Sequence, residues 1–568
     1  MLNYVNYVNY VRMIKLYDEK YTFYGRLQKN EKFKCYNKEE ISSSMIIADY
    51  LSLINKYFFE KKEEKINYNY TTLSVPDYYT IFQKKELKLI CESLGMKDIN
   101  IINESSAITM YYGYTKYRDM FVSEKTKVDK NMIKHVIFID SGYSKTTFTY
   151  SSFSYLNFKI HLVKSYYNLG GRNIDGILFD YCKEAFMKEQ TLSKNDSESF
   201  MNIKNKVRLL QAIDKARKAL SINDDTVITV DSFFDENDLS NPIKKEDYER
   251  IINSFIKDYE YNLKNFKNEI EKMNNNKLPN NLSIEMAGEL IRTPILQDKI
   301  KNIFNIPVSK TILVDECISV GCSLIGYYIN NKLPINTFGK MYFYNYYDIL
   351  LDVTQGKENN IIFKKNGLDD GESFIYKKNI KEILSRTNID FIFKYKDEDV
   401  KNLCENKELY HFKVNTTELK KNNLNWEKCE NIIFDIKLSY SDEIIFKIFL
   451  EKNNAKFECN INNCIIDDSY INSEKTKKES IKEILTKHKE FDELYLKFTE
   501  KRNELIKKIN MLKETNNTNE LINFENEIKM LDSLDFKKKT QKFTEIEKKF
   551  MEYLSKDPQN SFRLFKND

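Results

Sequence analysis

Two short polar turns carry the residue types that could bind a phosphate group. The first is Asp140-Ser141-Gly142-Tyr143-Ser144, which follows the apolar run Val136–Ile139. Such a turn can aim backbone N–H groups and hydroxyls at a phosphate, while its aspartate holds a magnesium-bound water. The second turn carries Gly170 and Gly171 ahead of a predicted helix, where glycine lets backbone approach an anion closely. Taken alone, each turn is more simply an ordinary polar connection.

A third candidate is the segment from Asp214 to Ser221. Its polar residues Asp214, Arg217, Lys218 and Ser221 are spaced by three and four positions, which predicts one face of a helix. Considered by itself, this face is more simply a solvated Lys/Arg surface.

The elements around these residues alternate between β-rich runs and amphipathic stretches. Between about Tyr70 and Tyr328 the order is Thr72–Val75, Lys85–Leu94, Val136–Ile139, Lys206–Leu220 and Val227–Val230. Strand-then-helix alternation predicts α/β layers with partly parallel sheets.

The pattern changes twice after Pro334. Apolar residues first alternate with polar ones, at Ile389–Tyr395 and on both sides of the turn at Ser441–Glu443, which predicts a β-hairpin within a β-sandwich over 336–470. After Lys475 the spacing becomes helical, from Ile481 to Phe498 and from Phe543 to Leu554, and predicts a small helical bundle.

Further segments occur along the chain in a particular order, and this order allows the weak motifs to be interpreted together. They are Val75–Tyr79, Ile101–Ala107, the two turns, Asp214–Ser221, Gly288–Pro294 and Asp315–Gly321. This series resembles the nucleotide-binding domain of heat shock protein 70 (Hsp70) relatives, in the family's order and spacing, over about residues 40–330.

The resemblance implies a multidomain α/β, β and α architecture with the two-lobed actin-like ATPase fold, its first lobe incomplete. The implied domains are a truncated lobe I (1–131), lobe II (132–332), a β-sandwich substrate-binding domain (336–470) and a helical lid (476–557).

Within the superfamily the residues are most similar to the Hsp110 branch. Asp140-Ser141-Gly142-Tyr143-Ser144 is closer to that branch's Asp-Ile-Gly-His-Ser than to the triple-glycine loop of ordinary 70-type chaperones. Asn103-Glu104-Ser105-Ser106 lacks the proline that usually follows Asn-Glu, and Ile335–Tyr347 has no aspartate-bearing Leu-Leu linker.

The resemblance also implies a site for ATP or ADP with magnesium, with Asp140 acting on the metal through water. It assigns Asp140, Gly142 and Ser144 to the phosphates and magnesium, and Gly170 and Gly171 to a facing phosphate loop.

The other assignments concern the nucleoside and the lobe connections. The resemblance assigns Asp214, Arg217, Lys218 and Ser221 to the adenosine, and Gly288 and Arg292 to the other side of the base. It assigns Asp315 and Glu104 to the segments connecting the lobes.

Two departures from the family pattern argue against hydrolysis. Residues 1–40 show neither the Gly/Thr-rich phosphate loop nor the lysine that assists hydrolysis in relatives, so either the chain is truncated at its start or the lobe has decayed. Glu289 stands where relatives usually have a second glycine. Because phosphoryl transfer needs fixed cations and donors around the triphosphate, we expect impaired ATPase activity and assign no catalytic residue.

The amino-acid composition indicates which partners and which cellular compartment to expect. The chain has 90 Lys and Arg against 85 Asp and Glu, spread evenly, so we expect no nucleic-acid partner. Nine cysteines without a CxxC pair predict reduced thiols in the cytoplasm, and the four histidines have no metal-ligand spacing. Apolar runs fall short of the roughly 20 residues that span a bilayer, so we expect no membrane partner.

The function that this implies is an Hsp110-like co-chaperone. It would release nucleotide from an Hsp70-type partner and hold unfolded polypeptide clients, with ATP as a structural ligand. Two alternatives stay open, an ATP-dependent folding chaperone of the Hsp70 type and a degenerate interaction scaffold that binds no nucleotide.

Overall fold

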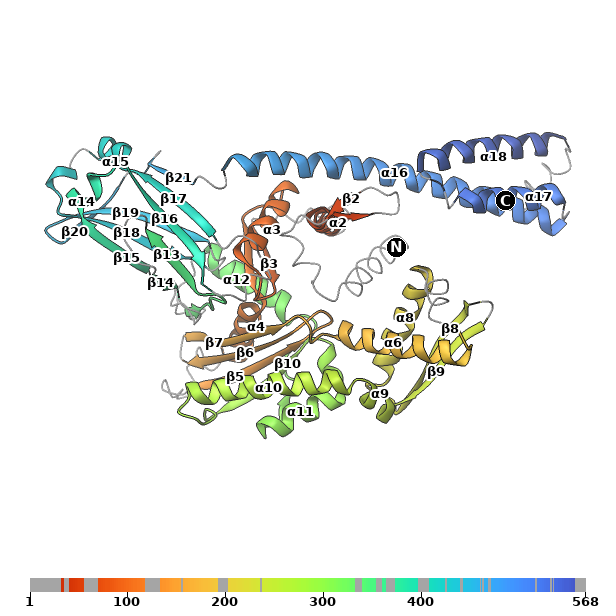
Figure 1. Ribbon diagram of the computed structural model, residues 1–568, viewed down its shortest axis with the longest axis horizontal. Helices are drawn as coiled ribbons and strands as arrows, with labels where there is room; N and C mark the ends of the chain where they lie inside the picture. The colour runs from red at the N-terminus through yellow and green to blue at the C-terminus, as the bar shows by residue number, and fades with distance from the viewer. Residues whose placement is uncertain are drawn as a thin grey trace. The chain divides into compact units, whose positions relative to one another are not determined.

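The computed structural model contains two compact units (Figure 1). One contains Ile66–Asn472, and the other contains Ser473–Asp568 with Asn30–Lys65. The structure describes residues 32–34, 40–55, 70–117, 133–154, 157–192, 203–234, 237–331, 340–353, 360–363, 373–396, 408–423, 426–439, 443–459, 461, 464–467, 471–515, 518–531, 534 and 536–556. Most of residues 1–40, where the first hairpin is predicted to be missing, residues 335–339 of the interdomain segment 335–347, and Cys35 and Cys404 lie outside the described residues.

A six-stranded mixed sheet forms the centre of the first unit. Its strand order is β11-β10-β5-β6-β7-β12, with β5 parallel to β10 and antiparallel to β6. The strands are β5 (Lys134–Ser141), β6 (Thr146–Ser154), β7 (Asn157–Tyr166), β10 (Leu282–Ala287), β11 (Val308–Ser309) and β12 (Lys340–Tyr342). Alternate residues of β5 enter opposite cores, because Ile137 and Ile139 face one layer and Val136 and Phe138 face the other.

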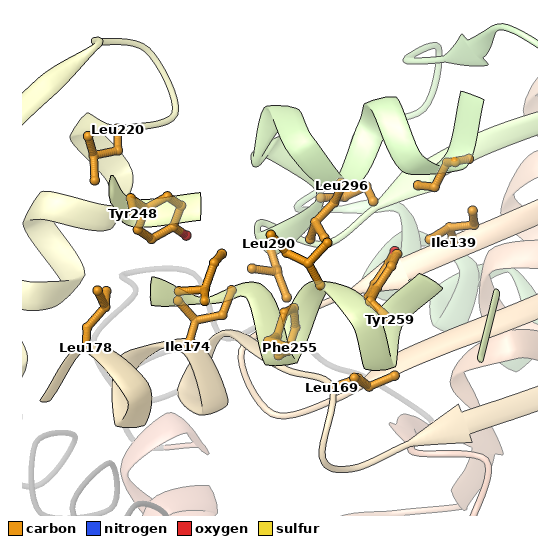
Figure 2. Packing of buried hydrophobic residues seen from close by; sticks show 14 of the residues in the cluster. Ile139, Leu169, Ile174, Leu178, Leu220, Tyr248, Phe255, Tyr259, Leu290 and Leu296 are labelled. Carbon is orange, nitrogen blue, oxygen red and sulfur yellow. The ribbon is translucent and has the colours of Figure 1, made fainter. Parts of the chain in front are cut away.

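The larger core lies between this sheet and the helices on one of its faces (Figure 2). These helices are α6 (Gly171–Glu189), α8 (Ile203–Ala219), α9 (Lys245–Ile251), α10 (Asn253–Met273) and α11 (Pro294–Phe304), with the hairpin of β8 (Asp225–Phe234) and β9 (Asn237–Lys244) beside them. On α10, Tyr259, Leu263 and Phe266 follow one another at helical spacing and are fully buried. Figure 2 shows Tyr259 and Leu296 among the residues that fill this layer.

The opposite face carries α4 (Glu104–Tyr112) and α12 (Cys317–Asn331). These helices pack closely, because a Cβ at Gly321 would lie 2.0 Å from the carbonyl oxygen of Ala107. A π-helical turn, η3 (Gly113–Tyr117), continues α4. Beside them lie the parallel strands β3 (Thr71–Val75) and β4 (Ile99–Asn103) with α3 (Ile81–Ser93).

A β-sandwich follows in the same unit. One sheet has the order β14-β13-β16-β17-β21 and the other β15-β18-β19-β20, all antiparallel. The strands are β13 (Ile349–Val353), β14 (Asn360–Phe363), β15 (Ser373–Asn379), β16 (Asn388–Tyr395), β17 (Glu408–Asn415), β18 (Asn431–Leu438), β19 (Ile444–Lys452), β20 (Ala455–Glu458) and β21 (Ile465–Asp467), with the short helices α14 (Ile380–Leu384), α15 (Thr416–Asn422) and η6 (Trp426–Lys428). The predicted hairpin is β18–β19, with Leu438 opposite Ile444. Phe391 and Phe434 join the two sheets, 4.7 Å apart between ring centroids.

The sandwich is attached to α3 and to the residues just before it by buried polar contacts. The Tyr395 hydroxyl accepts a hydrogen bond from the Ile81 N–H at 2.8 Å, and the Tyr347 hydroxyl donates to the Tyr78 carbonyl at 2.6 Å. At the part-exposed edge, Lys88 pairs with Glu443 at 2.6 Å. Since Ile81 is the first residue of α3, its N–H has no acceptor within the helix and depends on Tyr395.

The second unit is mostly helical. It contains α16 (Ile471–Thr515), α17 (Asn519–Met530) and α18 (Phe536–Lys556), together with α2 (Ser43–Asn55) and the hairpin of β1 (Lys32–Lys34) and β2 (Glu40–Ser42). Phe498 and Phe543 meet in its core with ring centroids 5.2 Å apart. The predicted α/β layers, β-sandwich and C-terminal helices are therefore confirmed, whereas the predicted domain boundaries remain predictions. None of the described helices combines the length and apolar character that crossing a membrane requires.

A half-buried histidine lies on the central sheet. The Ser152 hydroxyl and His161 Nε2 are 2.7 Å apart, and the His161 ring lies 5.1 Å from the ring of Tyr150. Burial lowers the pKa of His161 to about 4 from a usual 6.5. The folded chain therefore keeps His161 neutral in a pH range where an unfolded chain would protonate it.

The attachment of α3 to the sandwich can be tested with Tyr395→Phe. This change leaves the buried Ile81 N–H without an acceptor, so we expect the unfolding free energy to fall by about 1–3 kcal/mol. Urea unfolding followed by fluorescence reports on the sandwich, because Trp426 is the single tryptophan of the chain and packs against the sandwich core. Tyr261→Phe, at a residue 66% exposed, is the control and should have no measurable effect. Equal stabilities of the two variants would contradict this interpretation.

The pH dependence of stability tests the neutral His161. Its contribution is complete above the unfolded pKa of 6.5 and is lost as the pH falls toward the folded pKa of about 4. The advantage of the wild type over His161→Gln should therefore shrink by about 3 kcal/mol across that window. Urea unfolding at several pH values measures it, with pH 7.5 as the reference. Stability curves that stay parallel would show that His161 takes up its proton without cost.

Candidate functional site

The turn between β5 and β6 is held in a fixed shape by its own backbone. The N–H of Gly142 donates to the carbonyl of Lys145 at 2.9 Å. The turn places Asp140 at the end of the buried strand β5 and Ser144 between Tyr143 and Lys145.

The start of α6 packs directly onto this turn. Gly171 N–H donates to the Gly142 carbonyl at 3.1 Å, and Arg172 N–H donates to the Tyr143 carbonyl at 2.9 Å. A Cβ at Gly170 would lie 2.4 Å from the Tyr143 carbonyl oxygen, so no larger residue fits there without a shift of backbone. The N–H of Gly170 itself donates to the Asn173 side chain at 3.0 Å.

These contacts give the two predicted phosphate turns a structural role of their own. The N–H groups of Gly142, Gly170, Gly171 and Arg172 all have acceptors within the chain. A phosphate held by those N–H groups would have to replace these bonds, so side chains and the remaining N–H groups of the turns are the available donors.

Arg217 links α8 to α6 from a buried position. Its guanidinium pairs with Asp175 and with Asp214, both at 2.8 Å, and its NH1 lies 3.6 Å from where a Cβ of Gly171 would be. Burial opposes the charge, but the two carboxylates outweigh burial and raise the pKa of Arg217. Arg217 is therefore a cation already neutralised by the protein.

The remaining residues of the predicted α8 face point outward or along the helix. Lys218 is half-exposed and pairs with Asp214 at 3.2 Å. The Ser221 hydroxyl donates to the Arg217 carbonyl at 3.2 Å, one turn farther along.

The turn after β10 completes the contacts around the β5–β6 turn. Gly288 has φ +78°, and a Cβ there would lie 2.4 Å from the Ser141 carbonyl oxygen and 2.8 Å from Asp140 Oδ1. The next residue, Glu289, is exposed and lies 4.0 Å from Lys218 Nζ. Four segments therefore form a closed ring of contacts: the β5–β6 turn, the start of α6, α8 and the turn after β10.

Arg292 and Asp315 form a separate pair at the rim. Arg292 lies in the 3-10 turn η4 (Leu290–Arg292), and Asp315 precedes α12. Their side chains are 3.0 Å apart and each is more than half exposed. The pair joins the turn after β10 to α12 and leaves the Arg292 side chain accessible to solvent.

Lys145 connects Glu104 to this ring, a role that sequence reasoning missed. Its ammonium pairs with Glu104, lies 3.4 Å from Asp140 Oδ2 and donates to the Thr147 hydroxyl at 2.9 Å. Burial opposes the charge on Lys145, but Glu104 and Asp140 outweigh it and raise the pKa of Lys145, whereas burial raises the pKa of Glu104. The only signal in the sequence was a lysine inside the Asp140 turn.

Asp77 lies beside this cluster. It is fully buried, and it accepts hydrogen bonds from the hydroxyl and the N–H of Ser105, the second residue of α4. Burial raises the pKa of Asp77 to about 6. Asp77 and Glu104 thus bring two carboxyl groups from the β3–β4 side of the unit toward Lys145.

Comparison with known proteins identifies the family. A family model described as Hsp70 protein matches residues 20–339, more than half of the chain. The chain belongs to the Hsp70 family. Its predicted fold class, which includes the actin-like ATPase fold of that family, is thereby confirmed.

Individual relatives agree with this assignment and with the predicted likeness to the Hsp110 branch. The chain is 28% identical to the 97 kDa heat shock protein of Mesocentrotus franciscanus over 254 residues, 44% of this chain and 27% of that protein. It is 26% identical to the human heat shock 70 kDa protein 4L over 44% of this chain and 28% of that protein. For the heat shock protein hsp88 of Neurospora crassa the values are 26% identity over 50% of this chain and 38% of that protein. The match therefore spans less than two fifths of each relative.

The geometry fits a nucleotide better than it fits magnesium. Lys218 and Arg292 are exposed cations next to the ring of contacts and could approach a phosphate or a base. A magnesium ion needs carboxylate oxygens or bound waters around it, yet Asp140 and Glu104 share the ammonium of Lys145. Among the described residues, no group of three or more His, Cys, Asp or Glu side chains is placed to hold a metal ion.

The close contact of the two turns predicts a strong difference between two glycines of the same segment. Gly170→Ala should lower the unfolding free energy by about 1–3 kcal/mol or more, because the new methyl group overlaps the Tyr143 carbonyl. Gly176→Ala, within α6 and with nothing within 4 Å of its Cβ position, should raise it by about 0.5–1 kcal/mol. Urea unfolding followed by circular dichroism measures both. If Gly170→Ala were as stable as Gly176→Ala, the two turns would not be packed together.

Proposed function

We propose that this chain is an Hsp110-like co-chaperone that acts in the cytoplasm. It accelerates nucleotide release from an Hsp70-type partner and holds unfolded polypeptides, and ATP or ADP stabilises it as a structural ligand. Membership of the Hsp70 family and the heat shock relatives support this role. The cysteines of the described residues, all of which are free thiols, are consistent with a reducing compartment.

The closed ring of contacts is the observation that carries the nucleotide part of the proposal. Residues from the β5–β6 turn, α6, α8 and the turn after β10 converge although they are far apart in sequence. A ligand that touches all four segments would bind the folded lobe and not the unfolded chain, and would stabilise the lobe by mass action. In this proposal the ring belongs to a lobe II that spans 132–332.

The charges in the ring favour a structural ligand over hydrolysis. Transfer of a phosphoryl group requires cations that are free to stabilise the charge on the transferred group. The buried cations Lys145 and Arg217 each share two carboxylates already. This supports a resting site for a nucleotide in preference to an ATP-hydrolysing folding chaperone.

The sandwich offers a surface for extended clients. The strand β20 lies at the edge of its sheet, and all four of its residues are exposed, including Phe457 at 56%. An exposed edge strand can pair with an extended polypeptide, and an adjacent apolar side chain adds affinity. We propose that the sandwich, over 336–470, holds clients at this edge and that the helices over 476–557 act as its lid.

Release of fluorescent ADP from a preloaded Hsp70 chaperone tests the exchange role. Adding this protein in excess should raise the release rate at least about tenfold, equivalent to about 1.4 kcal/mol of barrier. Heat-denatured protein at the same concentration is the control. An unchanged release rate would contradict the exchange role. The remaining candidate functions would then be a holdase and an interaction scaffold.

A pair of surface variants separates the two activities. Ile222→Glu alters an 87% exposed residue just after α8 and is expected to weaken exchange, because lobe II is proposed to grip the partner. Phe457→Glu alters the β20 edge and is expected to weaken only the suppression of client aggregation, measured by light scattering. Both variants should unfold like the wild type, since both side chains are exposed. Equal losses of both activities in both variants would show that exchange and client holding are not on separate surfaces.

A further inference from the structure

Lys145 is a buried cation at the centre of the predicted phosphate and magnesium site. The residue is 7% exposed, and its ammonium faces Glu104 from α4, Asp140 from β5 and Thr147 from β6. Asp77 lies close enough to act on it electrostatically. The cation that neutralises these carboxylates is therefore a side chain of the protein itself.

The position of the ammonium is fixed by the fold. The Lys145 carbonyl accepts the hydrogen bond that closes the β5–β6 turn, and the side chain is held by three partners from three elements. Gly288 packs against Asp140 and Ser141 from the other side, which leaves Asp140 little room to turn away. The lysine cannot leave without exposing an uncompensated group of carboxylates in a buried place.

A divalent cation would compete with this ammonium for the same oxygens. Magnesium requires about six oxygen ligands at roughly 2.0–2.1 Å in a regular octahedron. Carboxylate oxygens can fill these positions directly or hold the waters that fill them. An ammonium within hydrogen-bonding range of Asp140 and Glu104 occupies that space and repels a second cation. The carboxylates cannot serve both cations at once.

We propose that the Lys145 ammonium takes the place of magnesium in this protein, so that a nucleoside diphosphate binds at the ring without a divalent cation. This inference rests on the proposed nucleotide role. It goes further by assigning the cation of the site to a residue of the chain itself. Nucleotide affinity then becomes independent of free magnesium, and the site holds no metal of its own while Lys145 is present.

Calorimetric titration with ADP tests the first consequence. The wild type should bind ADP with the same Kd, within about threefold, in magnesium and in EDTA, a difference of less than about 0.7 kcal/mol. A loss of affinity of tenfold or more in EDTA would overturn the inference. If ADP binds in neither condition, the nucleotide part of the proposed function fails, and the metal measurement below decides the role of Lys145 by itself.

Binding of Mn²⁺ to the nucleotide-free protein tests the second consequence. Electron paramagnetic resonance of free Mn²⁺ should show no site in the wild type and about one new site in Lys145→Met, where Asp140 and Glu104 become available. Lys145→Met with Asp140→Asn should lose that site again. Lys164→Met is the matched control, because Lys164 is an ion-paired lysine on β7 that bonds Glu269 at 2.8 Å, and it should behave like the wild type.

The double variant Lys145→Met with Glu104→Gln protects the test against misfolding. It removes one charge of each sign and keeps the cluster closer to neutral, so it should retain the near-ultraviolet circular dichroism of the wild type. In this variant Asp140 is free of the ammonium, and ADP binding should become at least about fivefold tighter when magnesium is added. A folded Lys145 variant that gains neither a Mn²⁺ site nor a magnesium dependence would overturn the inference, as would a Mn²⁺ site in the wild type that Asp140→Asn abolishes.

Discussion

The site depends on backbone that approaches backbone at distances only glycine allows. Gly170 and Gly288 reach the Asp140 turn from different sides, and a Cβ at either position would lie 2.4 Å from a carbonyl oxygen of that turn. Hydrogen bonds from Gly171 and Arg172 then tie the start of α6 to the same turn. Because these contacts involve main chain on both sides, they cannot be relieved by a change of side-chain rotamer.

This packing decides where the charged side chains can go. With the turn fixed, Lys145 is directed at Glu104 and Asp140, and Arg217 is directed at Asp175 and Asp214. Each buried cation is therefore paired with two carboxylates. This pairing compensates the free-energy cost of burying the charge, and it leaves little positive potential to attract a ligand. Lys218 and Arg292 also pair with carboxylates, but their side chains are more than half exposed and can reach solvent or a bound molecule.

The sheet beneath the site separates two layers with different tasks. One face of β5 packs against the large layer of α6, α10 and α11, which holds the ring of contacts. The other face packs against α4 and α12, which bring Glu104 to Lys145. The helix α3, on that second side, in turn carries the sandwich through Ile81 and Tyr395. A continuous series of packed elements therefore runs from the candidate nucleotide site to the candidate client site within one unit.

Local patterns in the sequence determined most elements of this protein. The alternation around Phe434 and Ile448 predicted the β18–β19 hairpin, and the spacing from Asp214 to Ser221 predicted most of the polar face of α8, because these features depend on neighbours a few positions apart. The order of weak motifs was sufficient to identify the Hsp70 family and its fold.

Only the tertiary structure decided which polar and charged groups meet. Lys145 and Glu104 lie 41 positions apart, Arg217 and Asp175 lie 42 apart, and Ile81 and Tyr395 lie 314 apart. Ion pairing and burial depend on three-dimensional distance and desolvation, which no local period encodes. The sequence therefore indicated a phosphate turn at Asp140, whereas the fold placed a lysine where a metal ion was expected.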